Sequence, residues 1–388
     1  MIQLSSKTAG FTDSVIRRMT RICNQYGAVN LSQGFPDFDP PSEIQKRLEQ
    51  VATHGPHQYA VTWGAANTRK ALAEKIRTDS GLTVDPDSEL VITCGGTEAM
   101  MCAVLATLNP GDKVAIFSPF YENYGADATL AGAVPIFIEL HSPDFTFDLK
   151  ELEQAFRDGA KALILNNPSN PSGKVFSGEE LQAIAEIIRK YDAFVITDEV
   201  YEHIVYEGYE HIYFASLPDM RERTVMCNSL SKTYSITGWR LGYVMAPAAV
   251  TDRVRKVHDF LTVGAAAPLQ EAIVSGLTLP RSYYAGIKTL YEGKRSLFLK
   301  GLDDLGLAYF KPQGAYYVLV DISEFNYESD LEFCTDLARL VKVGAVPGSS
   351  FFADGRQNYI RFHFAKKDET LKAALDNLST LREKIRRR

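Results

Sequence analysis

SLSKTYSITGWR, residues 229–240, is the segment around which the rest of the sequence is organised. Lys232 lies here in a run of small hydroxyl residues, directly after the apolar run TVMCN at 224–228. Because an apolar run of this kind predicts a buried strand, the lysine would lie at that strand's end. A lysine whose pKa is lowered by burial or by a nearby cation, such as Arg240, can form a Schiff base with a bound aldehyde. Taken by itself, Lys232 is more simply explained as a surface lysine in a Ser/Thr loop, and the other motifs change that balance.

Short apolar runs rich in β-branched residues surround this stretch and predict further strands. They cover residues 90–93, 114–117, 134–138, 162–165, 194–197, 224–227 and 242–246. Helical patterns such as 97–108 and 179–190 lie between most of them. Continuous apolar strands alternating with helices predict an α/β fold, with a mostly parallel seven-stranded sheet between helices. Ligands of such sheets gather at the carboxyl ends of the strands.

The pattern changes beyond Pro268, where long helical stretches and two further apolar runs, 316–322 and 358–365, predict a smaller α+β domain. We expect a large domain over residues 42–280. A small C-terminal domain would cover 281–388, and an N-terminal arm would cover 1–41. In this arm a helix is expected over 12–26 and an aperiodic loop over 29–41, and Ser42 would cap the next helix, 42–52.

Composition excludes several classes of protein. The 388 residues carry 48 acidic and 42 basic groups, a net charge of −6, with no basic stripe, so a nucleic-acid partner is not expected. No apolar stretch reaches the ~18 residues of a membrane span, and no signal peptide is evident, so we expect a cytoplasmic protein. Five scattered cysteines predict free thiols. His203, His211, His258 and His363 form no pair with metal-ligand spacing, so no metal site is expected.

Polar residues follow several of the predicted strands. Gly95, Gly96 and Thr97 follow the first strand and open a helix, an arrangement that binds phosphate or simply makes a tight turn. The turn matches neither the dinucleotide fingerprint nor the P-loop. Tyr121 follows the second strand in the sequence Ser-Pro-Phe-Tyr and has core packing as its alternative.

The fourth and fifth strands end in amide and acidic residues. Asn170, in NNPSNPSG at 166–173, would bind a ligand oxygen or belong to an ordinary turn. Asp198 closes an apolar strand and is followed three residues later by Tyr201. A buried carboxylate needs a cationic partner or several donors, so Asp198 suggests either a ligand cation or a helix cap.

Taken in order, these motifs resemble those of class I/II aminotransferases, which are fold-type I enzymes that use pyridoxal 5'-phosphate (PLP). The Gly-Gly-Thr turn, the aromatic after Ser-Pro, Asn-Pro-x-Gly, Asp-x-x-Tyr, Ser-x-x-Lys and the following arginine occur in that family's order. The resemblance extends from about residue 29 to 365. LSQGFPDFDPP, TDEVYEHI and KTYSITGWRLGY look most similar to the methionine and kynurenine branch.

The resemblance implies catalytic and cofactor-binding roles. Lys232 would be the Schiff-base lysine and the acid/base of the proton shift. Asp198 would keep the pyridine nitrogen protonated, so that the ring acts as an electron sink. Asn170 and Tyr201 would hydrogen-bond the phenolic oxygen, and Tyr121 would stack on the ring.

The resemblance also assigns the phosphate and the substrate. The residues that would hold the phosphate are Gly95, Gly96, Thr97, Ser229 and Arg240. Arg361 would bind the substrate carboxylate in a pocket lined by Gly34 and Asn170. Tyr59 would reach the phosphate of a neighbouring subunit, which implies a homodimer with shared active sites.

The implied reaction moves an amino group from an L-amino acid to a 2-oxo acid by a ping-pong mechanism. Aspartate-specific relatives use a second cation, but residues 261–271, LTVGAAAPLQE, contain none, and Thr97 stands where a lysine would follow the glycine pair. We therefore expect neutral, sulfur-containing or aromatic donors to be preferred. The alternatives are a carbon–sulfur β-lyase, an aspartate-type aminotransferase, and a PLP-binding regulator, which would need an added DNA-binding segment.

Overall fold

Seven strands form the central sheet of the computed structural model, which describes residues 4–11 and 13–385. Their order is β2-β8-β7-β6-β5-β3-β4. The strands are β2 (Leu90–Thr93), β3 (Lys113–Ser118), β4 (Val134–Glu139), β5 (Ala160–Asn166), β6 (Phe194–Asp198), β7 (Thr224–Ser229) and β8 (Gly242–Met245). Only β8 runs against its neighbours in this sheet. The predicted seven-stranded, mostly parallel α/β fold is confirmed.

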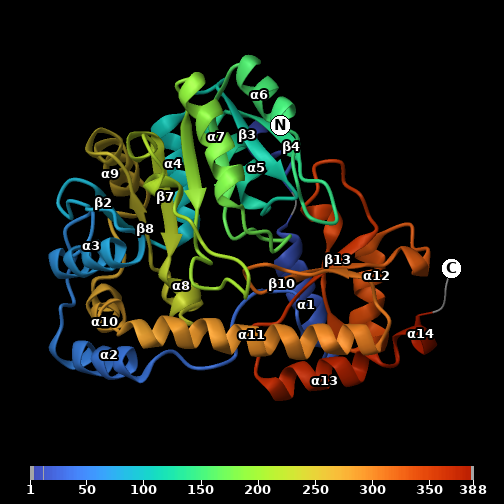
Figure 1. Ribbon diagram of the computed structural model, residues 1–388. Coiled ribbons are helices and arrows are strands. Elements are labelled where there is room, and N and C mark those ends of the chain that lie inside the picture. The colour runs from blue at the N-terminus through green and yellow to red at the C-terminus, as the bar shows by residue number, and fades with distance from the viewer. Residues whose placement is uncertain (1–3, 12, 386–388) are drawn as a thin grey trace.

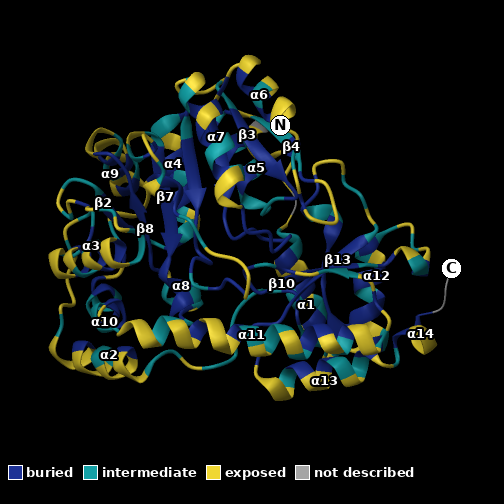
Figure 2. Cartoon of the chain, viewed as in Figure 1, coloured by how far each residue is buried: buried dark blue, intermediate teal, exposed yellow. Residues whose placement is uncertain are grey.

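Helices cover both faces of this sheet (Figure 1). Consecutive residues of a strand point to opposite faces of the sheet. Ile116 packs in the core beneath α4, α5 and α9, whereas Ala115 packs in the core beneath α6 and α7. The five helices are α4 (Gly96–Thr107), α5 (Asn123–Ala131), α6 (Leu149–Arg157), α7 (Gly178–Lys190) and α9 (Ala248–Thr262). Burial on both faces explains why the inner strands have continuous apolar sequences, and Figure 2 shows β3 and β7 buried, whereas the edge strand β4 is only partly buried.

Helix starts were only partly predictable from the sequence. Ser177 caps α7 in a reciprocal capping box with Glu180, a start signal that can be recognised in the sequence. The expected Ser42 cap is wrong, because Ser42 is the first residue of α2 (Ser42–His54) and no side-chain cap bond forms there. Pro41 precedes it, and its fixed φ suits a position at the edge of a helix.

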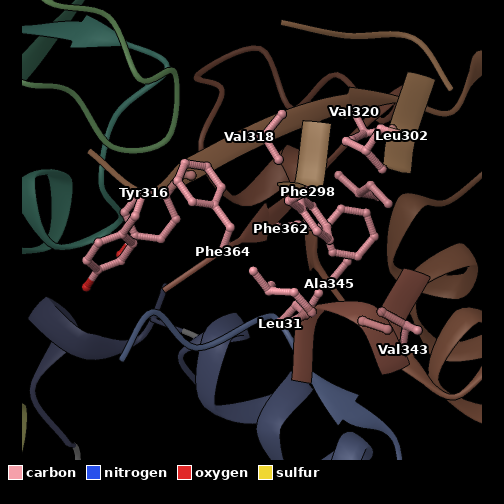
Figure 3. Close-up of a cluster of buried hydrophobic side chains, with 14 of the residues drawn as sticks. Leu31, Phe298, Leu302, Tyr316, Val318, Val320, Val343, Ala345, Phe362 and Phe364 are labelled. Atoms are coloured by element: carbon pink, nitrogen blue, oxygen red, sulfur yellow. The ribbon is translucent and has the colours of Figure 1, made fainter. Parts of the chain in front are cut away.

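A second, antiparallel sheet has the order β12-β13-β10-β9. Its strands are β9 (Tyr309–Phe310), β10 (Tyr317–Asp321), β12 (Val346–Pro347) and β13 (Tyr359–His363). Figure 3 shows the core on one face of this sheet, where Phe298, Phe362 and Leu31 point toward one another from distant parts of the chain. Residues before 42 therefore share a core with residues after 281.

The N-terminal segment is more ordered than expected. Within the predicted loop 29–41, β1 (Val29–Asn30) pairs in parallel with β11 (Val343–Gly344). The expected helix 12–26 corresponds to α1 (Val15–Tyr26), and Thr12 lies outside the described residues. A two-residue strand has no periodicity of its own, which is why only the tertiary structure reveals it.

The 24-residue helix α11 (Arg281–Asp304) runs along the molecule past both sheets (Figure 1). The helix begins at Arg281, where the sequence predicts that the small C-terminal domain begins. The division into a large domain over 42–280, an N-terminal arm and a small domain stays a prediction. The other helices are α3 (Ala66–Ser80), α8 (Leu230–Thr233), α10 (Ala267–Leu277), α12 (Asp330–Asp336), α13 (Asp368–Leu378) and α14 (Leu381–Lys384). No helix within residues 4–11 and 13–385 is long and apolar enough to cross a membrane.

Candidate active site

The candidate site lies at one edge of the central sheet, where the parallel strands end. β6 ends at Asp198, β7 ends at Ser229, and the antiparallel β8 begins at Gly242 beside Ser229. Lys232 follows Ser229 in the short helix α8. Parallel strands bring their carboxyl ends to the same edge, so residues far apart in sequence meet here.

Lys232 is half-buried, and its Nζ donates to the carbonyl oxygen of Gly34 at 3.2 Å. The pKa of Lys232 is lowered, chiefly by burial and further by the charges of Arg240 and Arg361, against the opposing effects of Tyr317 and Asp198. A lysine held in this way loses its proton more readily than one in water, so it is suited to act as a nucleophile and base.

Asp198 is buried and has few partners for a carboxylate. The Tyr124 hydroxyl donates to its Oδ2 at 2.6 Å, and the Val200 backbone N–H lies 3.4 Å from Oδ1. Burial raises the pKa of Asp198 to about 6, although the Tyr124 bond acts in the opposite direction. A buried carboxylate with this little support is suited to receive a cation or an N–H donor.

Asp127, on α5, lies near Asp198 and is a second buried acid. Its Oδ2 has no hydrogen-bond partner among the described residues. Burial, together with the smaller effect of the Asp198 charge, raises the pKa of Asp127 to about 7. The site edge therefore holds two buried carboxyl groups that disfavour each other's ionisation.

Arg361, on β13, is almost fully buried and is oriented by several contacts. Its Nη1 donates to Asn170 Oδ1 at 2.7 Å, and its Nη2 donates to the Ser32 carbonyl at 2.9 Å. The guanidinium lies over the rings of Tyr317 and Phe351. Its Nε has no partner within the described part of the chain. This geometry leaves a donor of a fixed guanidinium available for a carboxylate ligand.

Tyrosines form one wall of the site. The hydroxyls of Tyr201 and Tyr317 are 2.9 Å apart, and the Tyr316 hydroxyl donates to the Gly34 carbonyl at 3.0 Å. A Cβ on Gly34 would meet the Tyr317 hydroxyl, so only glycine allows this approach. Tyr121, packed edge-on against Tyr124, is also close enough for the charges of Asp198 and Arg361 to affect its pKa.

The turn after β2 forms a cradle beside Arg240. Gly95 has φ +87°, and a Cβ there would meet the Arg240 guanidinium. A Cβ on Gly96 would come within 3.3 Å of the Ser229 side chain. Thr97 is exposed in the first turn of α4, where backbone N–H groups have no partner within the helix. The cradle thus combines a helix N-terminus with a guanidinium, a combination that binds anions.

Tyr59 is the one candidate that lies apart from this cluster. It is 88% exposed, on the loop between α2 and α3. Val61, Phe260, Leu261 and Val263 are also at least half exposed. Thr62 of this loop contacts Asp259 and His258 on α9, so the exposed apolar side chains flank one loop–helix junction.

Two clusters bring histidines close to acidic groups. His203 lies with Asp79 and Glu202, but the ammonium of Lys75 already occupies the centre of this cluster. His258 lies with Glu98 and the buried thiol of Cys102. Sequence spacing did not reveal either cluster, because one member of each, Asp79 or His258, lies more than 100 residues from the other two.

A comparison with known proteins identifies the family. Residues 26–378 match the model of aminotransferases of class I and II. The chain belongs to this family. It is 36% identical to the methionine aminotransferase of Escherichia coli over 97% of this chain and 98% of the relative. A solved E. coli structure with methionine aminotransferase function superposes with a TM-score of 0.93, covering 98% of this chain and 100% of that one.

Two further aminotransferases are almost as similar. A probable N-succinyldiaminopimelate aminotransferase of Mycobacterium tuberculosis is 35% identical over 98% of each chain. A kynurenine–oxoglutarate transaminase of Dictyostelium discoideum is 33% identical over 98% of this chain and 96% of the relative. The predicted family is confirmed, whereas these names differ in the amino donor.

Class I and II aminotransferases use PLP, and the residues of this aminotransferase fit that cofactor. The cradle of Gly95, Gly96 and Arg240 offers an anion site for a phosphate. Buried Asp198 offers a carboxylate for a ring N–H, and Lys232 has the lowered pKa that an aldehyde requires.

Three residues of this aminotransferase site were not found from the sequence. Tyr124 and Asp127 follow Tyr121 in the run YENYGAD at 121–127, but nothing in that run marks them as partners of Asp198. Tyr317 was assigned only to a strand. Side chains alternate between the two faces of β10, and Tyr317 lies on the face toward the site. The sequence alone does not give the register of the strand, so it does not show which residues have this orientation.

Proposed function

We propose that this aminotransferase takes its amino group from neutral, sulfur-containing or aromatic L-amino acids and passes it to a 2-oxo acid. The observation that carries this proposal is the absence of cationic residues in 261–271, the segment in which aspartate-specific relatives carry an arginine. A distal carboxylate would be buried there without a counter-charge, which costs several kcal/mol, on the order of a thousandfold in binding. Tyr121, Tyr317 and Phe35 offer aromatic surface in its place.

The proposed cofactor contacts combine the roles that the family resemblance implies with the positions of these residues at the sheet edge. Asp198 would accept the ring N–H, and the hydroxyl of Tyr124 would keep the Asp198 carboxylate in position. Asn170 and Tyr201 would contact the phenolic oxygen, and Tyr121 would stack on the ring. The phosphate would lie in the cradle formed by Gly95, Gly96, Thr97, Ser229 and Arg240.

Arg361 would bind the substrate carboxylate. Asn170 and Ser32 fix its guanidinium before the substrate arrives, so little side-chain entropy is lost on binding. Gly34 leaves room for this carboxylate beside Tyr317. When bound, PLP supplies an electron sink for the bonds of the substrate α-carbon. Lys232 Nζ would take the α-proton and hold it for redelivery, as its lowered pKa allows.

A homodimer with shared sites would cover the exposed apolar side chains of Tyr59, Val61, Phe260, Leu261 and Val263. An apolar patch of this kind on a soluble enzyme usually marks an interface. Tyr59 would then reach the phosphate in the partner subunit's cradle. This arrangement explains why Tyr59 lies apart from the other candidates within its own chain.

Comparing donors tests the proposal. The ratio kcat/KM is measured for methionine, glutamine, kynurenine, phenylalanine, leucine, N-succinyldiaminopimelate and aspartate with one common 2-oxo acid. Neutral and aromatic donors are expected to exceed aspartate by at least about tenfold. The proposal fails if aspartate exceeds every neutral and aromatic donor.

N-succinyldiaminopimelate is the second candidate donor, favoured by the similarity to the mycobacterial enzyme. It would bring a distal acidic group to a segment that contains no cation. A higher kcat/KM for this donor than for methionine and kynurenine would select it. Product analysis distinguishes carbon–sulfur β-elimination from transamination. β-Elimination releases ammonia and a 2-oxo acid from the amino acid alone, whereas sustained transamination requires an added 2-oxo acid as acceptor.

A further inference from the structure

A largely buried carboxylate, that of Glu98, lies in the first turn of α4, beside the cradle. Glu98 Oε2 accepts the backbone N–H of Cys94, and its Oε1 accepts the Thr262 hydroxyl at 2.7 Å. A carboxylate at a helix N-terminus is favourable by itself, but it repels a phosphate that uses the same N-terminus. Phosphate binding at this helix therefore depends on what offsets the charge of Glu98.

His258, on α9, is the residue placed to offset it. Its ring is completely buried, and Nε2 lies 3.0 Å from the carbonyl oxygen of Thr62. Because a carbonyl oxygen can only accept, Nε2 must carry a proton. The other nitrogen, Nδ1, lies 2.8 Å from Glu98 Oε1. With a neutral ring, Nδ1 would direct a lone pair at the carboxylate, whereas a cationic ring donates to both acceptors.

The surroundings of the pair favour an ionised Glu98. Burial acts to raise the pKa of Glu98, but the hydrogen bonds from His258 and Cys94 outweigh it and hold that pKa below its ordinary value. Burial raises the pKa of the neighbouring Cys102 thiol, which keeps that thiol neutral. A metal held by Glu98, Cys102 and His258 would need both a thiolate and a free Nδ1 lone pair, so the cluster is better explained as an ion pair.

We propose that His258 is an imidazolium cation that neutralises Glu98, so that the cofactor phosphate meets a neutral pair beside the cradle. The inference rests on the proposed phosphate site at Gly95, Gly96 and Thr97. His258 also donates a hydrogen bond to the carbonyl oxygen of Thr62, three residues after Tyr59. This bond connects α9 to the loop of the proposed interface. His258 acts through Glu98 and is therefore a positioning residue.

The test compares ligands with and without a phosphate. The enzyme is stripped of cofactor and titrated with pyridoxamine 5'-phosphate and, separately, with pyridoxamine. Both compounds are amines rather than aldehydes, so neither forms a covalent bond with a lysine. His258→Gln is expected to weaken the affinity for pyridoxamine 5'-phosphate about tenfold and to change that for pyridoxamine by less than about twofold. His141→Gln, an exposed histidine, is the matched control.

The double variant Glu98→Gln/His258→Gln separates charge from packing. Removing the carboxylate should restore the affinity for pyridoxamine 5'-phosphate to within about threefold of wild type, because no uncompensated charge then remains. A purely structural role for His258 predicts no recovery. Equal loss of both ligands in His258→Gln, or no recovery in the double variant, would overturn the inference.

Two further measurements test the proposal even if His258→Gln fails to fold. Glu98→Gln alone should bind pyridoxamine 5'-phosphate at least as tightly as wild type, and weaker binding contradicts the proposal. Nitrogen-15 NMR of the wild-type enzyme should show protons on both His258 nitrogens, and a neutral ring or stoichiometric bound zinc also contradicts it. If wild-type enzyme transaminates but these variants behave as controls, only this inference fails and the proposed function stands.

Discussion

Asp198 shows how one residue's environment determines its chemistry. The carboxylate closes a buried strand and receives a single strong hydrogen bond, from Tyr124. The sequence predicted either a cationic ligand or a helix-capping role for Asp198, because an apolar strand rarely ends in an unsupported acid. It did not predict Tyr124 or Asp127, because their relation to Asp198 arises from the packing of α5 against the sheet.

Asp198→Asn should leave the fold intact and lower kcat by about two to three orders of magnitude. The amide keeps the shape and can still accept the Tyr124 hydrogen bond, but it cannot stabilise a positive ring nitrogen. Turnover at saturating PLP, together with circular dichroism, checks this. Near-normal kcat would remove Asp198 from the mechanism.

Asp127→Asn should alter the pH dependence of stability. The pKa of Asp127 rises from 3.8 to about 7, mainly through burial, so folding takes up a proton between these values. Its contribution to stability is full below about pH 4 and is lost as the pH rises toward 7. The melting temperature of wild type should therefore fall more between pH 5 and pH 8 than that of Asp127→Asn.

The exposed Asp144→Asn serves as the control for this comparison, because Asp144 has no ion pair among the described residues. It should follow the wild-type pH dependence. The difference between the pKa values corresponds to at most about 4 kcal/mol of unfolding free energy. Parallel melting curves for wild type and Asp127→Asn would show that Asp127 keeps an ordinary pKa.

At the scale of elements, the central sheet was the most predictable part of the chain. All seven apolar runs are strands, and in the inner strands burial on both faces explains the unbroken apolar sequence. The antiparallel direction of β8 was not predictable, since strand direction depends on the connection rather than on composition. The short pair β1 and β11 was missed for lack of any periodic signal.

The join between β8 and the cradle gives a prediction for one glycine. A Cβ on Gly242 would come within 2.5 Å of the Gly95 carbonyl carbon and 2.7 Å of the Gly96 nitrogen. These are backbone atoms that cannot move aside without opening the cradle. Gly242→Ala should therefore destabilise the enzyme and weaken PLP binding by at least about tenfold.

Gly238→Ala is the matched control, because a Cβ on Gly238 meets nothing within 4 Å. Thermal unfolding and spectroscopic PLP titration are measured for both variants. Wild-type behaviour of Gly242→Ala in both measurements would show that the cradle tolerates the displacement. Loss of both properties in Gly238→Ala would instead indicate a general sensitivity of this loop.

For the whole molecule, the family resemblance predicted more than local patterns did. Local patterns predict the sheet but not which strand ends face one another, and the order of six motifs supplied that information. Arg361 illustrates the difference, because its contact with Asn170 joins residues 191 positions apart. No periodicity or spacing in the sequence predicts such a contact.

The proposed homodimer with shared active sites predicts complementation between inactive variants. Tyr59→Ala and Lys232→Ala homodimers should each have little activity. After mixing in equal amounts and subunit exchange, half of the dimers are hybrids, and each hybrid has one site with both residues intact. Activity should then approach about a quarter of the wild-type value.

Mass spectrometry of differently labelled subunits confirms that exchange has taken place. Each variant taken alone through the same procedure is the control. If exchange is complete and activity does not return, Tyr59 does not act across an interface, and the exposed apolar side chains need another explanation.

The central claim is that Lys232 is the lysine that reacts with PLP, between Asp198 and Arg361 at the edge of the sheet. Borohydride reduction of the PLP-loaded enzyme, followed by peptide mapping, tests it most directly. We expect a stoichiometric pyridoxyl label on Lys232 and none on Lys75, Lys174 or Lys366, which are the buried lysines of the described residues. A stoichiometric label on any other lysine would contradict the account.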